Sequence, residues 1–194
     1  MTALELLDSR PFARTRDLER AGLSRAALQR LVHRGVITRL RRGIYSRSGE
    51  IRVTEHHDLA AVSTRVTRGV VCLLSALRFH RMGTQNPSEV WVAIDPKARK
   101  PRVGVPPTRF VRFSGQALST GIEHHLIEGI TVAITSPAKT VADCFKYRNK
   151  IGLDVALEAL REYRRSRRPL GELLQAAQTV RVARVLRPYL EALT

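Results

Sequence analysis

The sequence predicts a two-domain α+β protein, and three observations support this class. Its 194 residues, 43% of them hydrophobic, suffice for a sizeable core and lie between one large and two small domains in length. Residues 1–50 carry short helical patterns and much positive charge. Residues 51–194 hold the strands and longer helices that a separate core needs. We therefore expect one domain at 1–50 and a second at 51–194.

The charge of the chain indicates a polyanionic partner. The net charge is +17 and the pI is about 11.4, which is most often explained by nucleic acid and less often by an anionic membrane surface. Between Glu19 and Glu50 there are eight arginines and no acid. Solvated surfaces normally interleave both signs, so this segment is expected to bind an anion.

Two short helices are expected at the N-terminus. A leucine-rich stretch at 4–7 indicates the first, which ends before Pro11 because proline disfavours helix in the residue that precedes it. The second covers about two turns. We expect Thr15 to be its N-cap and Gly22 to end it in the left-handed conformation.

A third helix begins at Ser24, its N-cap, and ends at Gly35. Apolar side chains at helical spacing predict its buried face: Ala27, Leu28, Leu31 and Val32. The other face is polar and basic, with Arg25, Gln29, Arg30, His33 and Arg34. A short helix, a tight glycine turn and a longer helix with a basic face form a helix-turn-helix, whose second helix enters the major groove of DNA.

The segment after this helix predicts a β-hairpin in the position of a wing. Apolar residues at 36–40 and 44–45 flank a tip formed by Arg41, Arg42 and Gly43. The candidate DNA-binding residues are Arg25, Gln29, Arg30, His33, Arg34, Arg39, Arg41 and Arg42. The alternative is a small three-helix subdomain with a solvated charged face, which the acid-free run disfavours.

The second domain is predicted to be mixed α/β with a helical tail. We expect helices at 54–68 and 74–82, strands at 89–95 and 110–113, and a hairpin at 122–135. The hairpin should turn at Glu128-Gly129. A further helix should follow, with Ser136 as its N-cap and Pro137 at its first position.

This order of elements resembles the AbiEi family, the antitoxins and autoregulators of AbiE-type (type IV) abortive-infection toxin-antitoxin systems. The N-terminal likeness is carried by Leu18, Ala21-Gly22-Leu23-Ser24, Leu31-Val32, Arg34-Gly35 and Arg42-Gly43-Ile44-Tyr45. In the second domain, a strand that ends in Thr-Ser leads into a helix with a Thr-x-x-Asp pattern, here Thr140 and Asp143. The family often has an acid where this chain has Ala138 or Lys139, so any role of that acid does not carry over.

The resemblance covers almost the whole chain and implies a regulator that is not an enzyme and needs no cofactor. It implies a DNA-binding transcriptional autorepressor that recognises inverted repeats in its own promoter, with a possible homodimer on the DNA. It also implies an antitoxin that neutralises a nucleotidyltransferase-like toxin encoded beside it, by direct contact or otherwise. A solitary winged-helix regulator without a toxin is the alternative, which the neighbouring gene would distinguish.

A metal-dependent nuclease is the competing chemistry. In the stretch EVWVAIDPK, Asp95 would hold a divalent cation and Lys97 would stabilise the developing charge. The reaction also needs a second acidic ligand, for which Asp58 or Glu89 could serve. Pro96 and the basic loop after it are equally consistent with a strand exit.

No other pattern predicts a catalytic, metal or cofactor site. Neither His56-His57 nor His124-His125 can chelate a metal alone, because adjacent side chains diverge on a strand or helix. The basic cluster at 161–168 fits a helix end as well as a nucleic-acid or partner contact. Cys72 and Cys144 are expected to be buried and reduced. With no membrane-length apolar run and no export signal, this predicts a cytoplasmic protein without a membrane partner.

Overall fold

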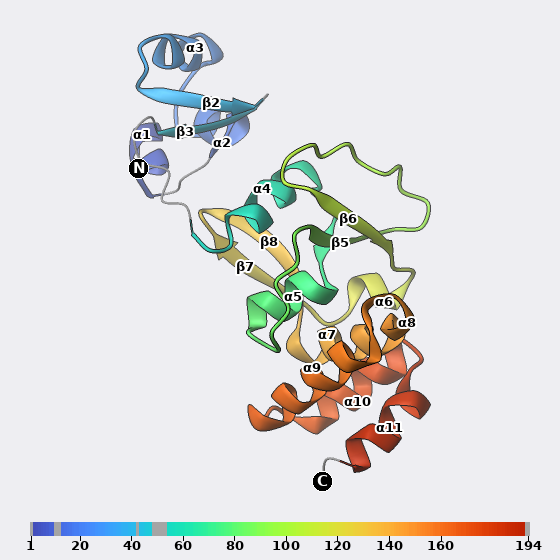
Figure 1. Cartoon of the computed structure of the whole chain (residues 1–194). Helices are drawn as coiled ribbons and strands as arrows, with labels where there is room; N and C mark the ends of the chain where they lie inside the picture. Colours follow the sequence, from blue (N-terminus) through green and yellow to red (C-terminus); the bar gives the residue numbers. More distant parts are fainter. Residues whose placement is uncertain (1, 10–12, 42, 48–53, 193–194) are drawn as a thin grey trace. The chain divides into compact units, whose positions relative to one another are not determined.

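The computed structural model describes residues 2–9, 13–41, 43–47 and 54–192 (Figure 1). The chain divides into two units, Met1–Ala60 with Leu126–Thr131, and Ala61–His125 with Val132–Thr194. The described chain combines helices with one antiparallel and one mixed β-sheet, so the predicted α+β class is confirmed. The predicted boundary after residue 50 falls outside the described residues and stays a prediction.

In the N-terminal unit, the described residues up to Arg47 form three helices and a small antiparallel sheet. Its elements are α1 (Ala3–Ser9), β1 (Ala13–Arg14), α2 (Thr15–Arg20), α3 (Arg25–His33), β2 (Ile37–Arg41) and β3 (Ile44–Arg47). Strand β3 lies between β1 and β2 and pairs antiparallel with both. One cluster of buried side chains joins the helices to the sheet: Ala3, Leu6, Leu7, Ala13, Leu18, Leu28, Ile37 and Tyr45.

The start of α2 differs from the prediction, because Thr15 is its first helical residue and not its cap. Arg14 holds the cap position in an extended conformation and makes no side-chain cap hydrogen bond. Strand β1, which the sequence did not predict, pairs Arg14 with Ile44 and keeps the chain extended up to this point. The end of α2 agrees with the prediction, since Gly22 has a φ of +93°.

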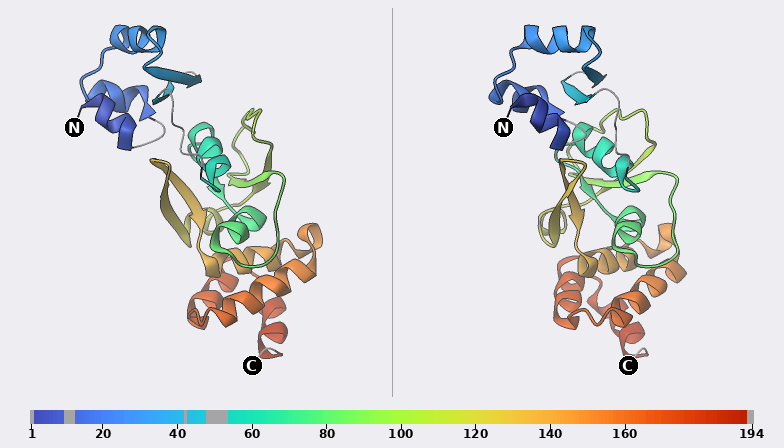
Figure 2. Two further views of the ribbon diagram at one scale, coloured as in Figure 1. Left: turned by 60° about the vertical axis from the view of Figure 1, so that its left-hand side comes forward. Right: turned by 90° about the vertical axis from the view of Figure 1, so that its left-hand side faces the viewer.

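The remaining elements form a five-stranded sheet and a set of helices that ends the chain (Figures 1 and 2). They are α4 (His57–Arg65), β4 (Val70–Val71), α5 (Leu73–His80), β5 (Val90–Ile94), β6 (Thr108–Arg112), α6 (Gln116–Ser119), β7 (Ile122–Ile127), β8 (Ile130–Thr135), α7 (Pro137–Lys146), α8 (Arg148–Ile151), α9 (Leu153–Arg165), α10 (Leu170–Thr179) and α11 (Ala183–Glu191). The strand order is β6-β5-β4-β8-β7. Strand β4 is antiparallel to β5 and parallel to β8, and β5 is parallel to β6.

Helix α7 forms the centre of the C-terminal core. Every residue from Pro137 to Phe145 is buried. The helix packs against α5 on one side and against α9, α10 and α11 on others, and both views of Figure 2 show these last helices gathered around it. The predicted start is confirmed: Ser136 Oγ accepts a hydrogen bond from the Lys139 N–H at 3.3 Å, and Pro137 lies in the first turn.

The predicted elements of the second domain are all present, and their ends differ from the prediction by at most three residues. The hairpin turns at Glu128 and Gly129, whose φ angles are +50° and +73°, as expected of a two-residue turn. Strand β4 is a central strand that the prediction missed. It has two residues, Val70 and Val71, which is too short to produce a periodic pattern.

Candidate nucleic-acid interface

Helix α3 is anchored by one side and leaves the other side in solvent. Ser24 Oγ accepts a hydrogen bond from the Ala27 N–H at 3.2 Å, which confirms it as the N-cap. Leu28 is 1% exposed and enters the core of the N-terminal unit. The other residues of the predicted apolar face, Ala27, Leu31 and Val32, are half-buried. The face opposite Leu28 is therefore free to contact a ligand.

The outer face of α3 carries Gln29, Arg30, His33 and Arg34, all exposed. Together with Ala26 they line a shallow hollow on the surface of the helix. Within the described ranges, no side-chain hydrogen bond or ion pair engages any of these four residues. Their positions differ by one, four and five residues, so they form one continuous patch across about one and a half helical turns.

Arg25 differs from the other basic residues of α3 because it has an acidic partner. Its Nε lies 2.9 Å from Glu19 Oε1, and Arg47 makes a similar pair with Asp8 at 3.2 Å. The fold therefore places two acids beside arginines of the acid-free segment: Glu19 of α2 beside Arg25, and Asp8 of α1 beside Arg47. Both pairs are exposed, and such pairs contribute only about 0–1 kcal/mol. A phosphate group could replace Glu19 as the partner of Arg25 at little cost.

The hairpin of β2 and β3 carries the remaining candidates. Arg39 is exposed and has no described partner. The register with β3 shifts between Arg39 and Arg41, which marks a bulge, and a bulge can redirect the side chains of a strand. Arg41 belongs to β2 by its backbone, but its side chain is not described, and Arg42 lies outside the described residues. Gly43 turns the chain with a φ of +80°.

The residues of the nuclease hypothesis have structural contacts. Asp95 Oδ1 accepts a hydrogen bond from the Lys97 N–H at 2.7 Å, which closes the turn after β5. Glu89, at the other end of β5, pairs with Arg109 at 2.7 Å. The described part of the chain holds no group of three or more His, Cys, Asp or Glu side chains that could bind a metal ion. These contacts give both Asp95 and Glu89 a structural role at the ends of β5.

The histidines and cysteines also have local roles. His57 Nδ1 lies 2.9 Å from Oε2 of the buried Glu128, and His125 Nε2 lies 2.9 Å from Glu123 Oε2. Cys72 and Cys144 are free and buried, as predicted, and burial raises the pKa of both thiols well above the usual value. Neutral thiols of this kind are unreactive.

The Thr-x-x-Asp pattern of α7 lies in the core. Thr140 Oγ1 donates to the backbone carbonyl of Thr135 at 3.1 Å. Asp143 Oδ2 accepts a hydrogen bond from Lys139 Nζ at 2.5 Å, and both side chains are almost fully buried. Burial raises the pKa of Asp143 to about 6, against the opposing effect of Lys139. This buried pair was not predicted from the sequence, although the spacing of four residues between a cation and an acid was a usable signal.

Comparison with known proteins agrees with this picture at the N-terminus. The family model for the AbiEi antitoxin, a transcriptional regulator, matches residues 1–48. The resemblance seen in the sequence is thereby confirmed for residues 1–48, which are similar to the AbiEi antitoxin and transcriptional regulator family. Its extension over the second domain stays a prediction.

The fold of the whole chain has a solved counterpart. The crystal structure of the RV2827C protein from Mycobacterium tuberculosis is similar over 97% of this chain and 79% of that one, with a TM-score of 0.53 and 14% identity. At this identity the likeness concerns the fold alone. No curated protein matches the chain. None of the described helices has the length and apolar character needed to cross a membrane.

Proposed function

We propose that this chain is a DNA-binding transcriptional autorepressor whose N-terminal unit is a winged helix-turn-helix. The observation that carries the proposal is the exposed, unpartnered face of α3. The order α1-β1-α2-α3-β2-β3 supports it, because α2, the Gly22 turn and α3 make the helix-turn-helix and the β2-β3 hairpin makes the wing. The match of this segment to a family of transcriptional regulators supports it independently.

In this proposal the exposed side chains divide into readers and anchors. Gln29 and Arg30, near the middle of α3, read base edges in the major groove, where a good bidentate contact contributes about 1–3 kcal/mol of discrimination. His33 lies one turn further along the same patch and is a further candidate. Phosphate contacts come from the remaining arginines of α3 and the wing: Arg25, Arg34, Arg39, Arg41 and Arg42.

The second part of the proposal is that the protein is an antitoxin. We infer that it neutralises a nucleotidyltransferase-like toxin encoded beside it and that a homodimer binds inverted repeats in the shared promoter. The family description supports the antitoxin role in general. The C-terminal unit has a core of its own, which supports a division of labour, because a unit with its own core can bind a partner without α3.

DNA binding is tested by a gel shift with the chain's own promoter. The complex should dissociate steeply with salt, because each neutralised phosphate releases counterions. The double variant Arg30→Ala/Arg34→Ala should lose promoter binding, whereas Arg184→Ala/Arg187→Ala, which removes the same charge from exposed positions on α11, should retain it. Equal loss in both variants, or equal affinity for promoter and random DNA, would refute sequence-specific recognition.

The antitoxin role is tested by growth of cells that express the neighbouring gene with each variant, beside a promoter reporter. Arg30→Ala/Arg34→Ala should lose repression and still protect, because neither side chain belongs to a core and their removal opens no cavity. If a stably produced double variant fails to protect, antitoxicity works through DNA binding. If the neighbouring gene product is harmless, the chain is a solitary regulator.

A further inference from the structure

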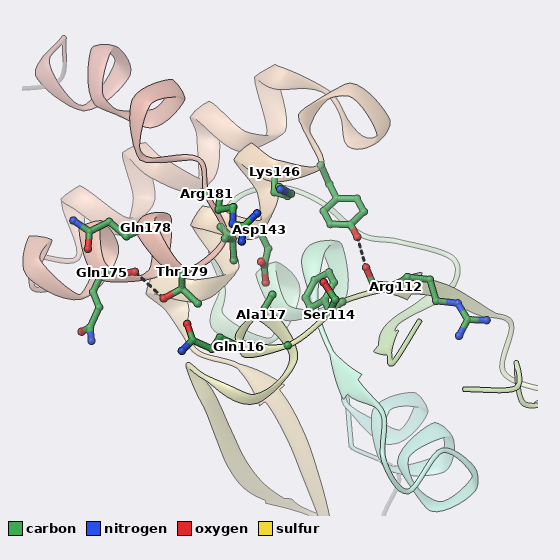
Figure 3. A pocket seen from close by; sticks show the side chains of 14 residues that line it. Arg112, Ser114, Gln116, Ala117, Asp143, Lys146, Gln175, Gln178, Thr179 and Arg181 are labelled. Atoms are coloured by element: carbon green, nitrogen blue, oxygen red, sulfur yellow. Dashed lines mark hydrogen bonds between the residues drawn. The ribbon is translucent and has the colours of Figure 1, made fainter. Parts of the chain in front are cut away.

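A cavity of about 770 Å³ opens in the C-terminal unit, between residues 112–117, the end of α7 and the end of α10 (Figure 3). Its volume falls in the range of small-molecule sites, about 300–1,000 Å³. Five uncharged polar residues line it besides Tyr147: Ser114, Gln116, Gln175, Gln178 and Thr179. Neither DNA binding nor the fold accounts for this concentration of hydrogen-bonding groups around one cavity.

Two cations lie at one side of the cavity. Lys146 and Arg181 are exposed, and neither has a hydrogen bond or ion pair within the described chain. Figure 3 shows both side chains on the same side as Asp143, whereas the Arg112 guanidinium points away from them. Arg112 instead donates to the backbone carbonyls of Asp95 and Ala98, at 2.6 and 2.7 Å. Lys146 and Arg181 therefore remain available to an anion in the cavity.

Asp143 places a hydrogen-bond acceptor at the floor of the cavity. Its Oδ2 is held by Lys139, but no described donor reaches Oδ1. Asp143 is among the residues that line the cavity, and Figure 3 shows its carboxylate directed into it, although only 2% of the side chain is exposed. Its Oδ1 can accept a hydroxyl hydrogen from a molecule bound there.

We propose that this cavity binds a small polyhydroxylated anion, a sugar phosphate or a sugar acid. Its oxyanion would contact Lys146 and Arg181, with the charge-assisted hydrogen bonds that guanidinium and ammonium groups make. Its hydroxyl groups would bind the amides of the wall and Asp143 Oδ1. The rings of Phe113 and Tyr147, with centroids 5.6 Å apart, add an apolar surface for the carbon skeleton. A lone inorganic anion would leave most of the volume and most of the polar groups unused.

The proposal is tested by calorimetry on the full chain at low ionic strength. Ribose 5-phosphate and gluconate are the two probes, and they distinguish a phosphate from a carboxylate as the oxyanion. D-Ribose and inorganic phosphate are the controls. D-Ribose has the hydroxyl groups without the oxyanion, and inorganic phosphate has the oxyanion without the polyhydroxylated carbon skeleton. At least one probe should bind about tenfold more tightly than either of these. If inorganic phosphate binds as well as both probes, or if neither probe binds, the proposal is wrong.

Two pairs of variants locate the binding. Lys146→Gln/Arg181→Gln should weaken binding of the active probe by about tenfold or more, whereas Arg184→Gln/Arg187→Gln, with the same change in charge outside the cavity, should not. Gln175→Ala/Gln178→Ala should also weaken it, and Gln85→Ala, which changes a half-buried glutamine outside the cavity, should not. Equal losses in the cavity and control variants would overturn the assignment. These experiments use no DNA, so their outcome is independent of the proposed repressor function.

Discussion

Helices α3 and α7 begin in the same way and lie in opposite environments. Each starts at a serine whose hydroxyl accepts a hydrogen bond from the N–H three residues later, at 3.2 Å for Ser24 and 3.3 Å for Ser136. In α3, Leu28 is fully buried and the rest of the helix is at least partly exposed. In α7, every residue from Pro137 to Phe145 is buried.

The same difference extends to charge. Arg30 and Arg34, on the outer face of α3, lie in water, where an unpaired cation costs little and stays available to a polyanion. The charges of Lys139 and Asp143 lie in the core, where each would cost several kcal/mol without the other. Lys139 is stabilised further by the face of the Phe113 ring, 4.5 Å from its Nζ. A charge on the outer face of α3 is therefore available to a partner from solvent, whereas the charges of Lys139 and Asp143 stabilise each other in the core.

The largest effect is expected from breaking the buried pair of α7. Asp143→Ala leaves Lys139 uncompensated in the core and should lower the free energy of unfolding by about 3–5 kcal/mol. Replacing both residues, in Lys139→Met/Asp143→Leu, should recover most of this loss because no buried charge remains. Urea unfolding followed by circular dichroism measures both. If Asp143→Ala were as stable as the parent, the ammonium group of Lys139 would have found another partner.

The next effect concerns the outer face of α3. Gln29→Ala and Arg30→Ala should each reduce the preference for the operator over a mutated operator, with a loss of about 1–3 kcal/mol for a lost bidentate contact. Arg41→Ala and Arg42→Ala should weaken binding to both DNAs alike, because phosphates carry no sequence. Fluorescence anisotropy on the two DNAs gives the ratio. Loss of discrimination from the wing variants alone would reverse the roles of helix and wing.

A pH effect should distinguish the buried charges from the exposed ones. Burial raises the pKa of Asp143 from 3.8 to about 6, so the folded chain binds more protons at this site than the unfolded chain does between these values. The resulting stabilisation is fully present below pH 3.8 and is lost as the pH rises through about 6, with a slope of at most about 1.4 kcal/mol per pH unit.

Asp143→Asn removes this titration while keeping the shape of the side chain. The difference in unfolding free energy between parent and variant should therefore shift against the parent as the pH rises from 4 to 6. Parallel stability curves over this range would mean that Asp143 is ionised throughout in the folded state. Arg30→Ala/Arg34→Ala serves as the control, and its unfolding free energy should change with pH in the same way as that of the parent.

The two helices also show what the sequence could and could not predict. Local signals were sufficient for α3: a cap at Ser24, a stop near Gly35 and apolar residues at helical spacing gave both its ends and its faces. They failed where partners come from distant segments, as with β1, which exists only because β3 pairs with it. No local pattern marked Lys139 as buried, yet packing of several helices against α7 buries it. Its burial is a tertiary property that no local window contains.

The smallest effect compares the two caps directly. Ser24→Ala and Ser136→Ala each remove one hydroxyl that accepts a backbone hydrogen bond, a loss of about 0.5–2 kcal/mol. The first N–H groups of α3 are exposed, so water can replace Ser24 and the loss should lie at the lower limit. Ser136 is half-buried and starts a helix whose first residues are all buried, so its loss should lie near the upper limit. Thermal unfolding of the two variants measures the difference, with the exposed Ser119→Ala as a control that should change little. If Ser24→Ala were the more damaging, solvent would not be replacing the cap, and the outer face of α3 would be less accessible than DNA recognition requires.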